Sequence, residues 1–247
     1  MKTENQLQEI DTQNRVSQQY DSERYGWPHS RMYHAWWAAD MVGATLDEGV
    51  WLDLGCGTGL IHEVMQRKGC HRQLVGIDIS HGMLRFARQK QMTVVMGDAE
   101  NLPFKSNSFD GILGKGVLHH LSDMGSSVSE LYRVLKPGGF LILTDPNLSP
   151  LRALKFMLMH KEKHYSPLHH SMHPIAYIRR FKSKFDIIDF KYFGFFAYPV
   201  AFPDILPYTV SEKCMERLMR FDEIISRIPI LNRLCWAFKL TARKAKT

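Results

Sequence analysis

The stretch VWLDLGCGTGL, residues 50–60, decides the fold of this chain of 247 residues. A short apolar run that contains Asp53 leads into three glycines, Gly55, Gly57 and Gly59, which alternate with other residues where a helix should begin. Such a run suits a strand buried on both faces of a parallel sheet, and glycines let the backbone approach a ligand without intervening side chains. The stretch therefore predicts a strand, a tight turn and a helix around a nucleotide-type cofactor.

The segments that follow repeat the pattern of an apolar run with an acid at its end. Residues 74–78 end in Asp78, which could bond both hydroxyls of a ribose, and Asp98 follows a third run and could accept from an adenine amino group. The glycine spacing alone does not identify the ligand, because dinucleotide enzymes use G-x-G-x-x-G and this chain has G-x-G-x-G. Further apolar runs at residues 109–113 and 135–143 complete a series of five strand signals.

With these features the chain resembles the class I S-adenosylmethionine-dependent methyltransferases, in particular the small-molecule group that includes the ubiquinone and menaquinone methylases. The resemblance is strong over residues 45–145. It implies S-adenosyl-L-methionine as cofactor, with Asp53 and the glycine turn at its methionine part, Asp78 at the ribose, and Asp98 with the Ala99 backbone at the adenine. The full set of expected cofactor residues is Asp53, Gly55, Cys56, Gly57, Gly59, Asp78, Ile79, Met83, Asp98, Ala99, Gly114 and Lys115. The alternative interpretation, an α/β sheet whose glycine turns bind no cofactor, leaves the acids at the strand ends unexplained.

Helix signals alternate with these strands, which implies crossover connections and a parallel sheet. We expect an α/β fold, a Rossmann-like seven-stranded and mostly parallel sheet with helices on both faces and an antiparallel last strand. The expected helices of the core lie at residues 60–68, 81–90 and 124–135. Beyond Asp145 we expect a helix at 174–181 and strands at 186–192 and 236–242, the last of which the resemblance places inside the sheet.

We expect one methyltransferase domain over residues 1–247. Residues 1–45 form an N-terminal lid and helix, 46–145 the cofactor-binding core, and 146–247 a substrate-side half with an insertion at about 193–234. Within the first segment, residues 1–15 look disordered, 16–25 predict a short helix over the cofactor, and 32–44 predict a helix whose aromatic residues pack in the core.

The composition indicates the broad class of protein. The apolar and charged fractions are ordinary for a globular protein, and the four cysteines lack the paired spacing of a disulfide framework or a zinc ribbon, so we expect a cytoplasmic protein. The N-terminus lacks a secretion signal pattern, and no apolar stretch is long enough to span a bilayer. The net charge of +7 is partly local, and solvated basic clusters near residues 179–184 and 243–246 explain it better than nucleic acid does.

The insertion is too long for a hairpin and is rich in aromatic residues interrupted by prolines. Two interpretations compete. In the first, its aromatic side chains wall a lipophilic acceptor pocket or touch a membrane surface. In the second, they seal the end of the core. The candidate substrate-binding residues are Tyr20, Tyr25, His164, Tyr165, Phe196 and Tyr198.

His119 and His120 are the candidate catalytic residues. They follow the fourth strand, where the chain passes close to the methyl donor at the carboxyl end of the sheet. An oxygen or carbon acceptor must lose a proton, and an imidazole titrates near neutral pH. Because a similar His-His segment occurs in relatives with different acceptors, a structural role for at least one histidine stays open.

A second histidine group does not predict a metal site. Prolines bracket this stretch, and neither a cysteine nor a carboxylate joins it at a recognised ligand spacing. We therefore expect no metal there. The group consists of His160, His164, His169, His170 and His173.

Together these features predict S-adenosylmethionine-dependent methyl transfer to a small, lipophilic or anionic metabolite. One alternative is a tRNA wobble-base methyltransferase, and another is a scaffold subunit that binds the cofactor without turnover. The expected partners are a small-molecule acceptor and, through the insertion, a membrane surface contacted peripherally; nucleic acid is disfavoured. The sequence leaves a monomer and a homodimer open, and it does not identify the acceptor atom.

Overall fold

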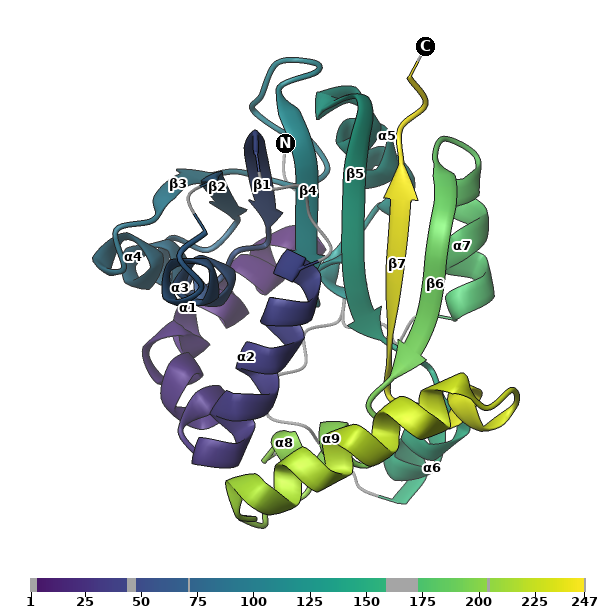
Figure 1. Ribbon diagram of the computed structural model, residues 1–247. Helices are drawn as coiled ribbons and strands as arrows, with labels where there is room; N and C mark the ends of the chain where they lie inside the picture. The colour runs from purple at the N-terminus through teal and green to yellow at the C-terminus, as the bar shows by residue number, and fades with distance from the viewer. Residues whose placement is uncertain (1–3, 44–47, 71, 159–172, 204, 247) are drawn as a thin grey trace.

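The protein is built on a seven-stranded sheet with the strand order β3-β2-β1-β4-β5-β7-β6 (Figure 1). This computed structural model describes residues 4–43, 48–70, 72–158, 173–203 and 205–246. Neighbouring strands from β3 to β5 run parallel, whereas β7 is antiparallel to both β5 and β6. In sheet order the strands are β3 (Thr93–Met96), β2 (Gln73–Asp78), β1 (Val50–Leu54), β4 (Phe109–Lys115), β5 (Leu135–Pro146), β7 (Ala237–Arg243) and β6 (Asp186–Phe193).

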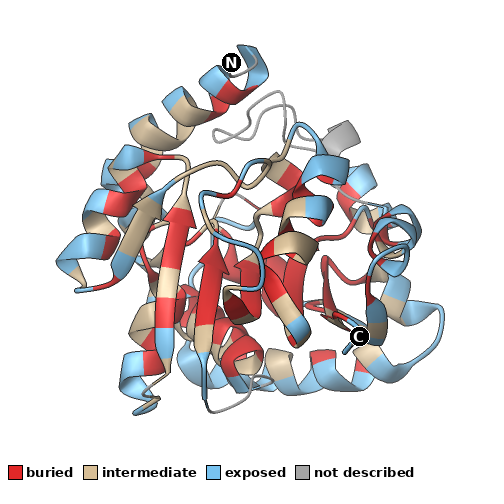
Figure 2. Ribbon diagram, turned by 90° about the horizontal axis from the view of Figure 1, so that it is seen from above, coloured by how far each residue is buried: buried red, intermediate tan, exposed pale blue. Residues whose placement is uncertain are grey.

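Helices cover both faces of this sheet. On one face, the apolar core joins Trp51 and Leu113 to helices α2, α3, α4, α8 and α9, and on the other it joins Leu52 and Ile112 to α5 and α7. Adjacent strand residues face opposite sides, so buried residues line both faces of the central strands (Figure 2). The helices are α1 (Glu4–Tyr25), α2 (Pro28–Gly43), α3 (Leu60–Arg67), α4 (His81–Gln89), α5 (Met124–Val134), α6 (Pro150–Leu158), α7 (Pro174–Lys182), α8 (Ala197–Ala201) and α9 (Glu212–Arg227), with 3₁₀ turns η1 (Leu118–His120) and η2 (Leu231–Leu234).

The predicted fold class is confirmed, including the antiparallel last strand between β5 and β6. Core helices and strands lie where the sequence placed them, with ends that differ by a few residues. The N-terminus differs from the prediction. Residues 1–15 were expected to be disordered, but α1 is a continuous helix from Glu4.

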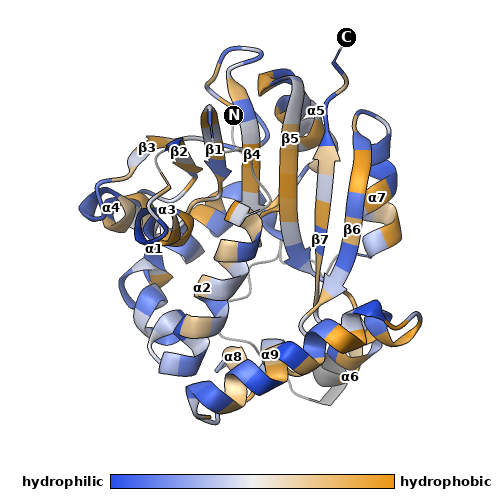
Figure 3. Cartoon of the chain, viewed as in Figure 1, coloured by the Kyte–Doolittle hydropathy of each residue, from blue (hydrophilic) through white to orange (hydrophobic). Residues whose placement is uncertain are grey.

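Helix α1 is held to the core by polar side chains, which explains why hydropathy does not reveal it. Asn14 Oδ1 accepts from Ser80 Oγ at 2.8 Å and from the Gly82 amide at 2.9 Å, and Thr58 Oγ1 donates to Asp21 Oδ1 at 2.6 Å. In Figure 3, long parts of β4 and β5 are apolar, whereas α1 is mainly hydrophilic. The helix therefore docks through hydrogen bonds rather than through an apolar stripe.

The insertion folds into α8 and α9 and closes one end of the core. Its aromatic side chains Phe193, Tyr198 and Phe202 are buried in the same apolar cluster as α2. The buried carboxylate of Asp222 on α9 accepts from the amides of Phe196 at 2.8 Å and Ala197 at 2.9 Å, at the start of α8. A single side chain thus fixes α8 against α9.

No helix among the described residues is long and apolar enough to cross a membrane.

Asp222→Ala should destabilise the protein, because it leaves the buried amide of Ala197 and the partly buried amide of Phe196 without their acceptor. Each buried unsatisfied donor costs about 1–3 kcal/mol, so we expect the free energy of unfolding to fall by about 2 kcal/mol or more. Asp222→Asn keeps one acceptor oxygen and should lose less. The measurement is urea unfolding, with Glu223→Ala on the exposed side of α9 as control. Equal stabilities of Asp222→Ala and Glu223→Ala would contradict this role.

Candidate functional site

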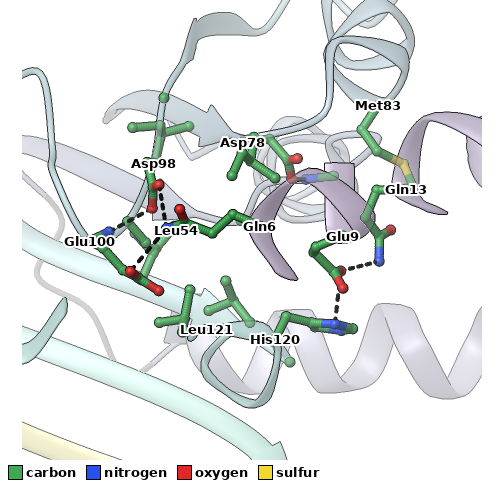
Figure 4. Close-up of a pocket in the computed structure, with 18 of the residues that line it drawn as sticks. Gln6, Glu9, Gln13, Leu54, Asp78, Met83, Asp98, Glu100, His120 and Leu121 are labelled. Carbon is green, nitrogen blue, oxygen red and sulfur yellow. Dashed lines mark hydrogen bonds and ion pairs between the residues drawn. The ribbon is translucent and has the colours of Figure 1, made fainter. Parts of the chain in front are cut away.

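A cavity opens at the carboxyl ends of the parallel strands, beneath α1 (Figure 4). The turns after β1 and β2 supply Gly55, Gly57 and Asp78 to its wall, and the turns after β3 and β4 supply further residues. From α1, Gln6 and Glu9 close the cavity on the opposite side. Ligands of open α/β sheets bind at this edge, so we call it the cofactor cavity.

The glycine turn is shaped by close packing. Gly55, Gly57 and Gly59 all have positive φ angles, of 63°, 52° and 86°. A Cβ on Gly55 would lie 2.4 Å from Val117 Cγ2, whereas a Cβ on Gly57 would meet no atom within 4 Å. Gly55 is therefore required for packing, and Gly57 for its left-handed backbone beside the open cavity.

Asp78 joins the first two turns. Its Oδ2 accepts from the Gly57 amide and its Oδ1 from the Ser80 amide, both at 2.9 Å. Burial raises the pKa of this carboxyl, while the donors from Ser80 and Gly57 lower it. Each carboxylate oxygen can accept a second hydrogen bond, so Asp78 can also bind ligand hydroxyls in the cavity.

Asp98 and Glu100 form an acceptor pair at the end of β3. Gln6 Nε2 lies 3.0 Å from Asp98 Oδ2 and 3.0 Å from Glu100 Oε2, and Figure 4 shows its carboxamide pointing between them. The Gln6 amide group offers the same donors as the amino group of an adenine. Gln6 therefore bonds to the carboxylate that the sequence assigned to the adenine.

Asp53 lies beside the cofactor cavity, in a smaller one that Cys56 and Lys115 also line. Burial raises the pKa of Asp53 to about 8, with a further increase from Asp78, and Lys115 opposes the change. Burial also lowers the pKa of Lys115 to about 7, helped by the charge of Arg24. Near neutral pH both groups therefore titrate, and a charged ligand would shift their protonation.

A second cavity, which we call the acceptor cavity, adjoins the first and is walled by aromatic side chains from α1, α2 and the insertion. Tyr198 and Phe202 are stacked with ring centroids 4.3 Å apart, and Phe202 contacts His34 at 4.8 Å. Lys115 Nζ lies 4.0 Å from the Trp37 ring centroid and 3.3 Å from His34 Nδ1. This cavity combines flat apolar walls with cationic groups.

The His-His segment lies between the two cavities. His119 is buried, its Nδ1 lies 2.7 Å from Asp145 Oδ1, and Tyr177 donates to the other oxygen of Asp145 at 3.2 Å. Burial raises the pKa of Asp145 to about 8, although donors from His119 and Tyr177 lower it. His119 lines the acceptor cavity, so this arrangement fixes the orientation of an imidazole at its wall.

His120 has a different environment from His119. Its Nδ1 lies 3.1 Å from Glu9 Oε1 on α1, and Glu9 also accepts from Gln13 at 2.8 Å (Figure 4). His120 lines both cavities. It therefore links α1 to the loop after β4.

The structure distributes the predicted cofactor and substrate residues over several places. Those that line the cofactor cavity are Gly55, Gly57, Asp78, Ile79, Met83, Asp98, Ala99 and Lys115. Asp53 and Cys56 line the smaller cavity beside it, while Gly59, at the start of α3, and Gly114, within β4, line neither of these cavities. Of the predicted substrate residues, Tyr20, Tyr25 and Tyr198 line the acceptor cavity, but Phe196 is 41% exposed and packs on Phe221 instead. His164 and Tyr165 lie outside the described residues.

Other residues of the two cavities were not identified from the sequence. Gln6 and Glu9 fall in the stretch expected to be disordered, and Trp37 was assigned to core packing. Arg24 and Arg152 carry no local motif and reach the acceptor cavity only through the tertiary fold. Within the described part of the chain, no three His, Cys, Asp or Glu side chains cluster as a metal site.

Comparisons with known sequences agree with this geometry. Residues 52–143 match the family model described as a methyltransferase domain. The demethylmenaquinone methyltransferase of Symbiobacterium thermophilum is 32% identical over 126 residues, 47% of this chain and 50% of that protein. The tRNA (carboxymethyluridine(34)-5-O)-methyltransferase of Arabidopsis thaliana is 38% identical over 96 residues, 38% of this chain and 23% of that protein. The chain spans half or less of the length of the curated relatives it matches first.

The fold is also shared with solved structures. An S-adenosylmethionine-dependent methyltransferase from Thermotoga maritima superposes with a TM-score of 0.67 at 21% identity, over 97% of this chain and 100% of that one. The likeness in fold therefore covers nearly the whole chain, whereas the family model matches residues 52–143 alone.

Replacement of Asp145 should change the pH dependence of stability. A carboxyl with a raised pKa stabilises the fold fully below its unfolded value of about 4, and this contribution is lost as pH rises through about 8. The free energy of unfolding of the wild type should therefore fall relative to Asp145→Asn over this range, by at most about 1.4 kcal/mol per pH unit. Urea unfolding between pH 5 and 9 measures the difference, and parallel pH profiles would contradict the assignment.

Proposed function

We propose that the protein transfers a methyl group from S-adenosylmethionine to a small, lipophilic or anionic acceptor, since residues 52–143 match the family model of a methyltransferase domain. The observation that carries this proposal is the junction of the two cavities. Both are lined by Gln13, Tyr20, Lys115, Gly116 and His120. A donor in one cavity and an acceptor in the other would meet there.

The residues of the cofactor cavity fit S-adenosylmethionine. Asp78 can accept from the ribose hydroxyls, the acceptor pair Asp98 and Glu100 suits an amino group, and the open side of Gly57 leaves room for close approach. Asp53 lies near enough to this cavity to stabilise the ammonium group of the methionine part. When bound, this cofactor supplies a methyl group activated by a positively charged sulfur.

The protein's own contribution is alignment, because in-line transfer depends on holding the acceptor atom close to the methyl group. For an oxygen or carbon acceptor a base must also remove a proton, and we assign this role to His119. Its Nδ1 lies 2.7 Å from Asp145 Oδ1, and this contact orients the imidazole at the wall of the acceptor cavity. His120, paired with Glu9, would position the lid over the junction.

The geometry favours a small molecule over tRNA. Helix α1 lies over the cofactor cavity, and α8 with α2 walls the acceptor cavity, so the reacting group must fit an aromatic enclosure. The relatives named above are a demethylmenaquinone methyltransferase and a tRNA methyltransferase, so the acceptor must be inferred from this chain's own cavity. A tRNA substrate would show steeply salt-dependent binding, which tests this second candidate directly.

The domain arrangement belongs to the same proposal. We assign residues 1–45 to closure over the cofactor, 46–145 to cofactor binding, and 146–247, with the insertion at about 193–234, to the acceptor side of a single domain. Contacts of α1 with Ser80 and Thr58, and of α8 with α2, support this division of roles.

Asp78→Asn should abolish most cofactor binding without unfolding the protein. Isothermal titration of the wild type with S-adenosylmethionine and S-adenosylhomocysteine should give saturable binding, and the variant should bind both at least about tenfold more weakly, because a charge-assisted hydrogen bond is lost. Asp186→Asn, at the exposed start of β6, is the matched control. A folded wild type that binds neither compound would rule out the proposed cofactor.

A further inference from the structure

The acceptor cavity has an unbalanced set of charged residues. Arg24, Lys115 and Arg152 all line it, and among the described lining residues none is Asp or Glu. The nearby acids have other contacts, since Asp145 bonds to His119 and Glu9 lies against His120. A cavity with cationic groups and no lining acid favours an anionic ligand.

Arg152 is the most enclosed of these cations. It lies in the first turn of α6, is only 4% exposed, and lines the acceptor cavity but not the cofactor cavity. Its Nη2 donates to the Trp236 carbonyl at 3.2 Å, whereas its Nε has no hydrogen-bond partner among the described residues. A buried guanidinium with an unused donor is costly unless a ligand completes its bonding.

The aromatic walls hold this guanidinium in place. Arg152 Cζ lies 5.2 Å from the Trp236 ring centroid and 5.5 Å from that of Tyr198, which in turn stacks on Phe202. Arg24 lies over the other member of this stack, with its Cζ 4.8 Å from the Phe202 ring centroid. Flat side chains fixed beside a charged group suit a ligand that has a planar apolar body and an anionic end.

The orientation of such a ligand follows from which residues the cavities share. Lys115, Gly116 and His120 line both cavities and mark the junction, whereas Arg152 lines the acceptor cavity alone. A ligand anchored at Arg152 would therefore present its opposite end to the junction.

We propose that the acceptor is a small planar anion whose carboxylate or phosphate group binds Arg152 and whose apolar body packs against Tyr198 and Phe202. This assignment rests on the proposed function, which it sharpens by naming the class of acceptor. The anchoring anion is separate from the atom that receives the methyl group. Arg24 adds a second positive charge along the same aromatic wall, which strengthens the selection against neutral molecules.

The test uses three probes of the same shape on the protein saturated with S-adenosylhomocysteine. 2-Naphthoate and 2-naphthyl phosphate carry the two anionic groups, and 2-naphthamide is their neutral counterpart. We expect at least one anion to bind at least about tenfold more tightly than the amide in isothermal titration, since hydrogen bonds to charged groups are the stronger ones. The comparison between the two anions identifies the carboxylate or the phosphate as the recognised group.

Variants of Arg152 test whether this residue binds the anionic group. Arg152→Met should weaken the preferred anion at least about tenfold, and Arg152→Lys should retain part of the affinity because it keeps the charge. Arg217→Met, on the exposed surface of α9, is the matched control and should bind like the wild type. Thermal unfolding and S-adenosylhomocysteine affinity, measured on each variant, report the fold and the cofactor cavity separately.

The outcomes separate this inference from the proposed function. Equal binding of the anions and the amide by the wild type would overturn the anionic acceptor even if every Arg152 variant were unfolded. Failure of both anions to bind while S-adenosylhomocysteine still binds would overturn it as well, and so would a folded Arg152→Met with unchanged anion affinity. Loss of S-adenosylhomocysteine binding by the wild type would instead contradict the proposed function.

Discussion

The rest of the site depends on the hydrogen bonds between Asp78 and the backbone of the glycine turn. In a parallel sheet the carboxyl ends of β1 and β2 meet at one edge, and Asp78 joins the turns there by accepting from Gly57 and Ser80. The turn after β1 could not be replaced by an ordinary one, because Val117 leaves no space for a Cβ at Gly55. The Asp78 carboxylate and the close contact between Gly55 and Val117 thus fix the turns at the base of the cofactor cavity.

Helix α1 is held to these turns by polar contacts. Ser80 accepts from the Met83 amide at the start of α4 and donates to Asn14 of α1, while Thr58 of the glycine turn donates to Asp21. The segment that closes the cavity is therefore bonded to the same turns that form it. Each of these hydrogen bonds contributes only about 1 kcal/mol net, because the same groups bond to water when they are apart.

The sequence predicted the sheet and the cofactor side well because both depend on local patterns. Apolar runs, glycines and strand-end acids place Asp53, Asp78 and Asp98 at one edge once a parallel sheet is assumed. It missed the first part of α1, residues 4–15, because periodicity detects apolar stripes and Gln6 and Asn14 dock through hydrogen bonds instead. The acceptor side was predicted only in part. Tyr198 lies in an aromatic run, whereas the role of Arg152 depends on contacts with residues more than forty positions away.

The two cavities of the site are built from different parts of the chain. Backbone turns and strand ends form most of the cofactor cavity, and Gln6 and Glu9 of α1 close it. Side chains on α1, α2, α6 and the insertion form the acceptor cavity, and Asp222 holds α8 in place from a separate helix. Under the proposed function, substitutions in these peripheral helices would alter the acceptor side while Asp78 and the glycine turn stay in place. These helices all lie outside residues 52–143, the part of the chain that matches the family model.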